Sequence, residues 1–418
     1  MQRLRSILCC LSLSAVLVAP QVAVAIQRAV ASGHHWPVDG AYSAGRGVVY
    51  VGLDGEPPSH PSLDYFDPQT RRTGTLIHLH GNKYRSAERP YLGFDLRQPA
   101  IGVLEDRHQI RDALGNFGFS VWHRPRATSQ PLIVLLEGSD DSTRDMGFLI
   151  PYFVGNGMAV LTFDQRGTGL SSGNWRFIGP EAKADDVVAA LRSLAGDRII
   201  DFRRIGVWGP SNGGWVAPIV AQRYPLAFMI LKSADSGSIA DNVLYEVRQE
   251  LERRHRFSAR QIEAALTFDR RMISSLATNS GWQQAGEDLR RARGAPWFSL
   301  TRVPPDFPIP PPPPVLAAYR AALIYDPTLV LDKTTVPTLA LFGGLDRNVD
   351  VAAAERGFRA DFAISGLKDA AFRVFPGADH LLEQSRTGYI GDETRPVRFV
   401  SGYPEIMIRW LREQRVLR

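Results

Sequence analysis

A serine flanked by small residues lies where a strand pattern gives way to a helix pattern. Residues 205–208 form a short apolar run typical of a buried strand, and residues 215–224 follow with a helical pattern. The sequence GPSNG at 209–213 lies between them. A Gly-x-Ser-x-Gly turn between strand and helix is typical of a nucleophile elbow, which lifts the serine hydroxyl out of the sheet. Ser211 is therefore a candidate nucleophile, and a glycine-rich turn with a solvated serine is the alternative.

A serine hydroxyl becomes a nucleophile only when a base takes its proton and a carboxylate orients that base. Asp346 follows the apolar segment 337–342, and His380 follows the last predicted strand, 371–375. Of the nine histidines, only His380 comes after Asp346. Side chains at the carboxyl ends of neighbouring parallel strands converge on one crevice. The order Ser-Asp-His therefore predicts a catalytic triad of Ser211, Asp346 and His380.

Each member of this triad also has a simpler interpretation. Asp346 could cap the helix that starts near residue 351, but Asp350 is better placed for that role. His380 alone could be an ordinary loop histidine, and we expect its neighbour Asp379 to face solvent. Three residues in the required order, each at a strand end, favour the triad.

The elements that must position these residues alternate along most of the chain. Strands are predicted at 117–122, 131–136, 158–163, 205–208, 227–231, 337–342 and 371–375, and helices at 145–156, 180–195, 215–224, from 351 and at 404–415. Apolar strands alternating with amphipathic helices predict a parallel sheet covered on both faces. This core would comprise residues 107–234 and 334–418.

The alternation stops between residues 235 and 333. Helices are predicted there at 241–255, 259–276 and 281–293, and eight prolines within 304–314 predict an extended segment. This block is expected to be a mainly helical insertion. Residues 26–106 read instead as a β-rich extension, with strands near 48–51 and 75–80. The LIHLHG sequence at 76–81 resembles an oxyanion-loop strand, but we interpret its histidines as ordinary strand residues.

The first 25 residues have the pattern of a secretory signal peptide. Arg3 and Arg5 precede a 13-residue apolar run at 7–19, and small residues follow at 23–25. A run of this length is too short to span a bilayer. We expect cleavage near Ile26 or Ser32, and secretion into the periplasm or the medium.

Removal of this segment changes the composition of the mature chain. Both cysteines, Cys9 and Cys10, would be lost, leaving no disulfide and no cysteine nucleophile. The formal charge of +6 would become +4, since two arginines and no acid leave. Scattered arginines at this charge indicate solubility rather than nucleic-acid binding.

From about residue 107 onward the chain resembles the α/β-hydrolases, in their serine aminopeptidase-like and prolyl-oligopeptidase-like branch. The sequence DQRGTGLS at 164–171 is similar to the Asp-x-Arg-Gly-x-Gly-x-Ser loop of those enzymes, and its start to proline iminopeptidases. GPSNGG at 209–214, GLD at 344–346 and GADH at 377–380 also match in order and spacing. The resemblance implies an α/β-hydrolase fold, with a mostly parallel sheet, helices on both faces and a helical cap at 235–333 that sets specificity.

The resemblance also implies roles for individual residues. Ser211 would attack a carbonyl carbon, His380 would act as base and then acid, and Asp346 would orient the imidazole. The backbone N–H groups of Asn212 and Ser139 would form the oxyanion hole.

The chain departs from its relatives at two positions. Glu137-Gly138 stands where many relatives have His-Gly, and that carboxylate would oppose an oxyanion unless Arg166 or Arg144 paired with it. Proline iminopeptidases usually carry Trp where this chain has Asn212, so the resemblance does not imply specificity for an N-terminal proline.

These observations predict a secreted serine hydrolase that cleaves a small-molecule ester or a peptide through an acyl-enzyme. No His/Asp/Glu cluster has convincing metal spacing, and no cofactor, nucleic acid or membrane span after signal removal is expected. An acyltransferase with the same triad and a non-catalytic binding protein remain alternatives. The arginines of the cap are interpreted as a solvated helix face: Arg253, Arg254, Arg256 and Arg260.

Overall fold

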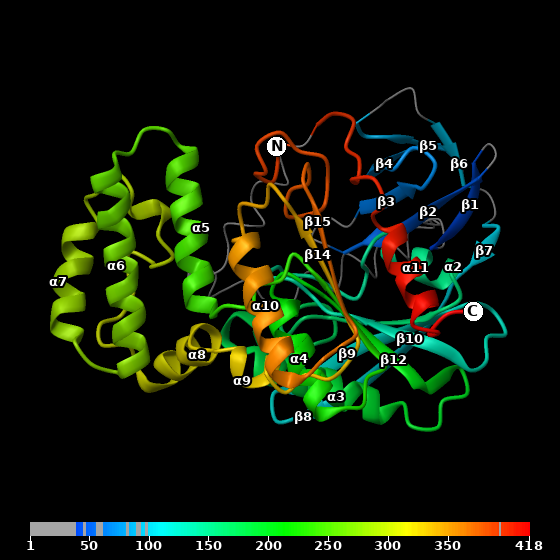
Figure 1. The fold of residues 1–418 in the computed structure, drawn as a ribbon, viewed down its shortest axis with the longest axis horizontal. Helices are drawn as coiled ribbons and strands as arrows, with labels where there is room; N and C mark the ends of the chain where they lie inside the picture. The colour runs from blue at the N-terminus through cyan, green and yellow to red at the C-terminus, as the bar shows by residue number, and fades with distance from the viewer. Residues whose placement is uncertain are drawn as a thin grey trace.

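The computed structural model describes residues 39–44, 47–55, 62–80, 83–88, 93–96, 99–392 and 394–418, and within these ranges the strands form two sheets (Figure 1). The predicted signal peptide at 1–25, with both cysteines, lies outside the described residues. Within them, no helix is both long and apolar enough to cross a membrane.

The larger sheet has eight strands in the order β15-β14-β13-β12-β10-β11-β9-β8. All pairs from β15 to β11 are parallel, whereas β9 is antiparallel to both β11 and β8. The strands are β8 (Leu104–Asp112), β9 (Gly115–His123), β10 (Gln130–Leu135), β11 (Ala159–Phe163), β12 (Ile200–Pro210), β13 (Phe228–Lys232), β14 (Thr338–Gly343) and β15 (Ala370–Phe375). The predicted core boundary at residue 107 falls inside β8.

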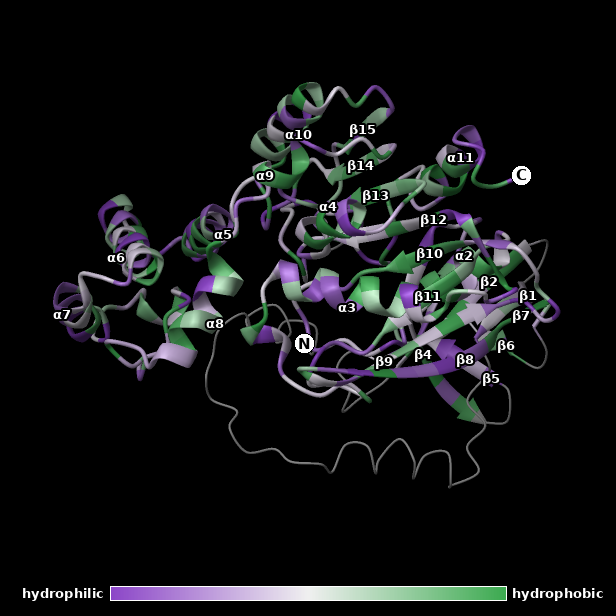
Figure 2. Ribbon diagram, turned by 90° about the horizontal axis from the view of Figure 1, so that it is seen from below, coloured by the Kyte–Doolittle hydropathy of each residue, from purple (hydrophilic) through white to green (hydrophobic). Residues whose placement is uncertain are grey.

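The strands are apolar on both faces because helices cover both. In β10, Leu132 and Val134 join one buried cluster, and Ile133 and Leu135 join the other. The helices of the first face are α3 (Pro180–Ser193), α4 (Gly213–Arg223) and α10 (Val351–Ser365), and those of the second are α2 (Leu149–Gly155) and α11 (Glu405–Glu413), as Figure 2 shows. The predicted α/β-hydrolase fold, with a mostly parallel sheet and a β-rich N-terminal region, is confirmed.

A helical block, which we call the cap, lies between β13 and β14 and projects to one side of the sheet (Figure 1). Its elements are α5 (Ile239–Arg253), α6 (Ala259–Thr278), α7 (Trp282–Ala292), the 3-10 turn η2 (Phe298–Leu300), α8 (Pro313–Leu323) and α9 (Thr328–Leu331). Trp215 of α4 packs into the cap's own apolar cluster, and its Nε1 donates to Gly237 O at 3.0 Å.

The end of the proline-rich segment differs from the prediction. Residues 304–314 were expected to be extended, but Pro313 and Pro314 form the first turn of α8. The first N–H groups of a helix have no partner within it, so proline loses no hydrogen bond there, and its fixed φ suits the helix.

The smaller sheet contains the N-terminal strands in the order β6-β5-β4-β3-β2-β1-β7, paired antiparallel. They are β1 (Gly40–Ala44), β2 (Gly47–Asp54), β3 (Ser62–Asp67), β4 (Arg72–His80), β5 (Lys83–Ser86), β6 (Gly93–Asp95) and β7 (Ile101–Gly102). This sheet packs on α2 through aromatic rings, with the centroids of Tyr50 and Tyr152 5.2 Å apart. The LIHLHG sequence begins in β4, where the ring of His78 packs against Tyr84 at 5.0 Å.

Candidate active site

Ser211 lies in a strained turn between β12 and α4. Its φ is +48°, a left-handed conformation that costs a non-glycine residue on the order of 1–2 kcal/mol. Such strain persists where surrounding structure enforces it, often at functional sites. Here Ser211 N donates to Lys232 O on β13 at 2.9 Å, and Ser211 O accepts from Gly214 N at 2.9 Å. The turn is thus held from both sides.

The glycines of the motif are required by close packing. A Cβ on Gly209 would lie 2.6 Å from the carbonyl oxygen of Gly213, and one on Gly213 would lie 3.1 Å from that of Glu137. Side chains at these positions would push the strand away from the helix. The Gly-x-Ser-x-Gly pattern is therefore a steric requirement of this elbow.

The predicted acid and base are in direct contact. His380 Nδ1 lies 2.8 Å from Asp346 Oδ2, and the Asp346 side chain is fully buried. The other carboxylate oxygen of Asp346 accepts from Asn348 N at 2.7 Å and Val349 N at 3.1 Å. Asp350 caps α10 by accepting from Ala353 N at 3.0 Å, as predicted. Asp346 is therefore available to orient the imidazole.

The nucleophile and the base are linked through β13, which lies between their strands. Lys232 O accepts from Ser211 N, and the next residue, Ser233, donates from Oγ to His380 O at 2.7 Å. Among the hydrogen bonds of the described residues, none joins Ser211 Oγ to His380. Such catalytic hydrogen bonds are often long before substrate binds. Ser211, Asp346 and His380 nevertheless all follow the carboxyl ends of parallel strands, β12, β14 and β15.

The predicted oxyanion donors adjoin the elbow. Close packing of Gly213 against Glu137 O brings the loop after β10 beside the start of α4. Gln165 Nε2 donates to Gly138 O at 3.3 Å and to Asp140 O at 3.0 Å, which fixes the carbonyl groups of that loop. In the described part of the chain, no hydrogen bond uses the N–H of Ser139 or Asn212. Both N–H groups are thus available to a ligand.

Arg144 and Arg166, which the sequence suggested as partners of Glu137, pair with other carboxylates. Arg144 Nη2 lies 2.9 Å from Asp164 Oδ2, and Arg166 Nε donates to Asp186 Oδ2 at 2.9 Å. Asp164 and Asp186 are buried carboxylates that need a cation. Among the ion pairs of the described residues, neither Arg144 nor Arg166 binds Glu137, which differs from the expected pairing.

Asp379 also differs from the expectation that it faces solvent, because it is fully buried. Its Oδ1 accepts from Leu381 N at 2.9 Å and from Glu383 N at 3.0 Å. The carboxylate therefore caps the turn that carries His380. A sequence shows which residues adjoin a histidine but not which backbone amides fold back over them.

Two lysines beside the triad were not singled out from the sequence. Lys183 Nζ donates to Asn212 Oδ1 at 3.2 Å and lies 5.0 Å from the ring centroid of Trp175. Lys232 is buried at the end of β13. The sequence did contain one sign of Lys232, because this lysine ends the otherwise apolar strand FMILK. Within the described ranges, no group of three or more His, Cys, Asp or Glu side chains could hold a metal ion.

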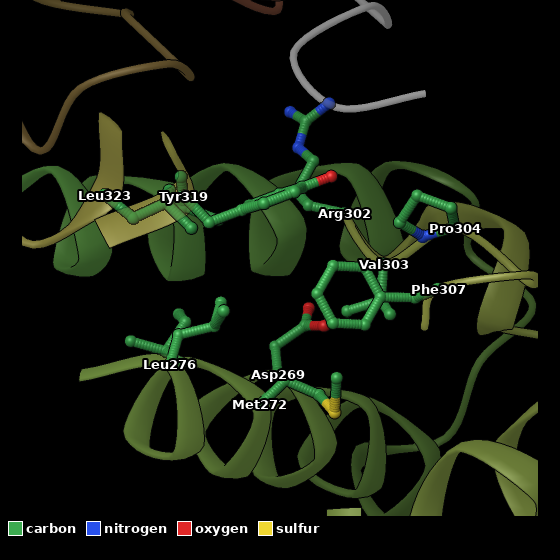
Figure 3. Close-up of a pocket in the computed structure, with 11 residues that line it drawn as sticks. Asp269, Met272, Leu276, Arg302, Val303, Pro304, Phe307, Tyr319 and Leu323 are labelled. Carbon is green, nitrogen blue, oxygen red and sulfur yellow. The ribbon is translucent and has the colours of Figure 1, made fainter. Parts of the chain in front are cut away.

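The cap contains a small cavity of about 30 Å³ whose lining residues all belong to the cap. Asp269 is 2% exposed, and within the described chain neither carboxylate oxygen has a hydrogen-bond partner. Figure 3 shows this carboxyl group directed toward Val303 and Phe307, with the Arg302 guanidinium pointing away. Desolvation raises the pKa of Asp269 to about 7, and attraction from Arg302 opposes the rise.

Replacing Asp269 with leucine is expected to stabilise the protein in alkaline solution. A carboxyl group with a raised folded-state pKa contributes stability below its unfolded pKa, and this contribution is lost as pH rises toward 7. The raised pKa of the Asp269 carboxyl group corresponds to about 4 kcal/mol. Calorimetry should show Asp269→Leu melting above the wild type at pH 8, with a smaller difference at pH 4. The same substitution at the exposed cap residue Asp306 is the control. A pH-independent difference would contradict this account.

Comparisons with known proteins show which families and structures this chain resembles. Residues 145–277, which include Ser211, match the model of the Prolyl oligopeptidase family. An Escherichia coli protein described as an uncharacterized 31.7 kDa protein in the traX-finO intergenic region is 35% identical over 88 residues. The match covers 20% of this chain and 30% of that curated relative, so the chain spans less than a third of the relative's length.

Solved structures with a similar arrangement include esterases and peptidases. The Pyrococcus furiosus esterase Pf2001 has a TM-score of 0.46 at 14% identity, covering 74% of this chain and 90% of that one. Porphyromonas gingivalis dipeptidyl peptidase 4 has a TM-score of 0.45 at 13% identity, covering 92% and 50%. A puromycin-hydrolyzing peptidase of Mycobacterium tuberculosis has a TM-score of 0.41 at 17% identity, covering 81% and 43%.

The sheet order places an elbow serine, a carboxylate and a histidine at the ends of neighbouring strands, and the family match covers the elbow itself. The fold is that of the α/β-hydrolases, and residues 145–277 are similar to the Prolyl oligopeptidase family.

Proposed function

We propose that this protein hydrolyses an ester or amide bond through an acyl-enzyme formed on Ser211. The observation that carries the proposal is the 2.8 Å contact between His380 Nδ1 and the buried Asp346 carboxylate, at the end of the sheet where Ser211 follows β12. Nδ1 faces the carboxylate, so Nε2 is the nitrogen left to take the serine proton.

The reaction follows from these positions. As Ser211 Oγ attacks the substrate carbonyl carbon, its proton passes to His380 Nε2. The resulting oxyanion accepts hydrogen bonds from the N–H groups of Asn212 and Ser139, and the loss of one such donor costs about 3 kcal/mol in known cases. Collapse releases the alcohol or amine with the proton from His380. Water then attacks the acyl group with His380 again as base, which restores Ser211.

Covalent labelling tests the identity of the nucleophile. A fluorophosphonate probe should phosphonylate the wild type at Ser211, shown by mass spectrometry of the labelled peptide, and should leave Ser211→Ala unlabelled. Labelling that persists in the variant would assign the nucleophile elsewhere. Ser193→Ala, at the exposed end of α3, is the control and should be labelled like the wild type, because its hydroxyl donates only to Ala190 O.

The ester and amide alternatives require substrates of both kinds. Short-chain p-nitrophenyl esters and aminoacyl naphthylamides should be compared by kcat/KM with the same enzyme preparation. The same triad cleaves both bonds, so the preference reports on the cap and not on the catalytic residues. Adding an alcohol such as methanol and measuring transfer products would identify an acyltransferase.

We also propose that the protein is exported. The pattern at residues 1–25 supports this, and the mature N-terminus is expected near Ile26 or Ser32. N-terminal sequencing and intact mass of protein from the periplasm or medium measure the cleavage site. Leu13→Arg with Val16→Arg should retain the precursor in the cytoplasm by interrupting the apolar run. Exported protein that still contains Cys9 would contradict the proposal.

A further inference from the structure

A short 3-10 turn, η1 (Trp175–Phe177), is bonded to the loop that carries the first proposed oxyanion donor. Trp175 Nε1 donates to Asp141 Oδ1 at 2.7 Å, and Asp141 follows Ser139 closely in the loop after β10. Arg176 Nη2 donates to the other carboxylate oxygen of Asp141 at 2.8 Å. Both oxygens of this carboxylate are thus held by η1, and the loop of Ser139 is anchored there.

The ring face of Trp175 is connected to the second proposed donor. Lys183 Nζ on α3 lies 5.0 Å from the centroid of that ring, which is a cation–π distance. The same ammonium group donates to Asn212 Oδ1 at 3.2 Å. Asn212 is the N-cap residue of α4, where its own N–H is the other oxyanion donor. One indole therefore connects the loop after β10, through its edge, with the start of α4, through its face.

Trp175 is itself held in place by its surroundings. It is 6% exposed, and its backbone N–H donates to Arg166 O at 2.8 Å. The Arg166 guanidinium is bound in turn to Asp186 on α3. The turn η1 also packs against α8 of the cap. The indole therefore has little freedom to move away from the groups that it contacts.

The charge of Asp141 strengthens its bonds to η1. Burial opposes ionisation, but the hydrogen bonds from Arg176 and Trp175 outweigh it and lower the pKa of the Asp141 carboxyl group. Hydrogen bonds to an ionised carboxylate are about twice as strong as those between neutral groups. Loss of either donor therefore weakens the attachment of the oxyanion loop.

We propose that Trp175 is a positioning residue that holds the two oxyanion donors, Ser139 and Asn212, at a fixed separation. Its indole edge acts through Asp141 and its face through Lys183. The inference rests on the proposed function of the triad and adds a residue to that site, although Trp175 does not touch the reacting atoms. Oxyanion donors act when they lie about 2.7–3.1 Å from the oxygen that becomes charged. Loosening of either segment therefore weakens transition-state stabilisation and leaves substrate binding unchanged.

The first test removes the indole N–H and keeps an aromatic face toward Lys183. With p-nitrophenyl acetate as substrate, Trp175→Phe should lower kcat about tenfold with KM changed less than about twofold, because a donor is displaced and not deleted. Affinity for a trifluoromethyl ketone, whose adduct with the serine carries an oxyanion, should fall by the same factor. A change confined to KM, or no change, would overturn the proposal.

Trp282→Phe is the matched control for this change. Trp282 Nε1 also donates to a side chain, Asn279 Oδ1, at 3.0 Å, but it lies at the start of α7 in the cap. This variant should keep the kcat and the inhibitor affinity of the wild type. An equal loss of kcat in Trp282→Phe and Trp175→Phe would show that the effect is not specific to the oxyanion hole, and would overturn the proposal.

Asp141→Ala tests the same contact from the loop, and it keeps the test valid if calorimetry shows that Trp175→Phe folds poorly. This half-buried side chain loses its bonds to both Trp175 and Arg176, so kcat should fall by about tenfold or more with KM little changed. The double variant should be no slower than Asp141→Ala, since both changes break one contact. A further loss of about tenfold in the double variant, or wild-type kcat in Asp141→Ala, would overturn the proposal.

Lys183 variants test the face of the indole. Lys183→Met should lower kcat about tenfold, because Asn212 loses its partner. Lys183→Arg should recover most of this loss, since a guanidinium group also lies over aromatic rings and donates to an amide oxygen. Wild-type kcat in Lys183→Met would overturn the role assigned to the indole face.

A fluorophosphonate probe separates failure of this inference from failure of the proposed function. If the probe does not label wild-type Ser211, the triad assignment fails. If it labels the wild type and Trp175→Phe at equal rates, the triad stands and the role of Trp175 is refuted. Labelling of Trp175→Phe at Ser211 that is complete but about tenfold slower supports the positioning role.

Discussion

Replacing Ser211 with alanine is expected to lower kcat by about 10⁶-fold, the size of effect known when the serine of such a triad is removed. The variant lacks the oxygen that forms the acyl-enzyme, while Asp346, His380 and the oxyanion donors remain. Binding is not removed, so KM should change little. Initial rates with p-nitrophenyl acetate, corrected for the uncatalysed reaction, measure the loss.

Glycine at the same position separates catalysis from strain. Ser211 has φ of +48°, which glycine adopts freely and alanine does not. Ser211→Gly should therefore be as inactive as Ser211→Ala but more stable than it by about 1 kcal/mol. Thermal melting of the two variants provides the comparison. Substantial activity in either purified variant would show that another residue attacks the substrate.

Replacing Asp346 with asparagine is expected to lower kcat by about 10⁴-fold while leaving the fold intact. The amide oxygen of the new asparagine can still accept from Asn348 N and Val349 N. Its NH₂ group then takes the place of Asp346 Oδ2 and faces His380 Nδ1 as a donor. The imidazole then accepts this hydrogen bond at Nδ1 and carries its proton on Nε2, which faces the serine. In this tautomer it cannot act as the base.

The neighbouring aspartate is the matched control for this change. Asp350 caps α10 through Ala353 N. Asp350→Asn should leave kcat within about twofold, since asparagine is also an effective N-cap. The opposite result, a large loss of kcat in Asp350→Asn with little loss in Asp346→Asn, would show that Asp350 and not Asp346 orients the imidazole.

The contact between Asp346 and His380 could be predicted because each of the two residues comes shortly after an apolar strand. Strand ends are visible in sequence, and parallel strands bring their carboxyl ends together whatever separates them along the chain. Asp346 and His380 were therefore identified without any knowledge of their distance. The same reasoning assigned Asp350 to the start of α10, because its position relative to the helix decides the hydrogen bond.

The charges around the triad could not be predicted in this way. Asp379 was expected in solvent, yet it is fully buried, because the amides of Leu381 and Glu383 turn back onto it. The partners of Arg144 and Arg166 likewise depend on which elements pack together. Ion pairs join residues distant in sequence, and no local pattern records them. The start of α8 at Pro313 was missed because proline runs favour extended backbone except in a first helical turn.

The direct pairing of β13 with β14 has a consequence for how selectivity can be changed. Met229 is in register with Thr338, so the chain leaves the sheet and re-enters it at adjacent positions. The cap is therefore an insertion that can be exchanged without changing the pairing of β13 with β14. Any replacement cap must pack against Trp215, because this residue belongs to α4 and is buried in the apolar cluster of the cap.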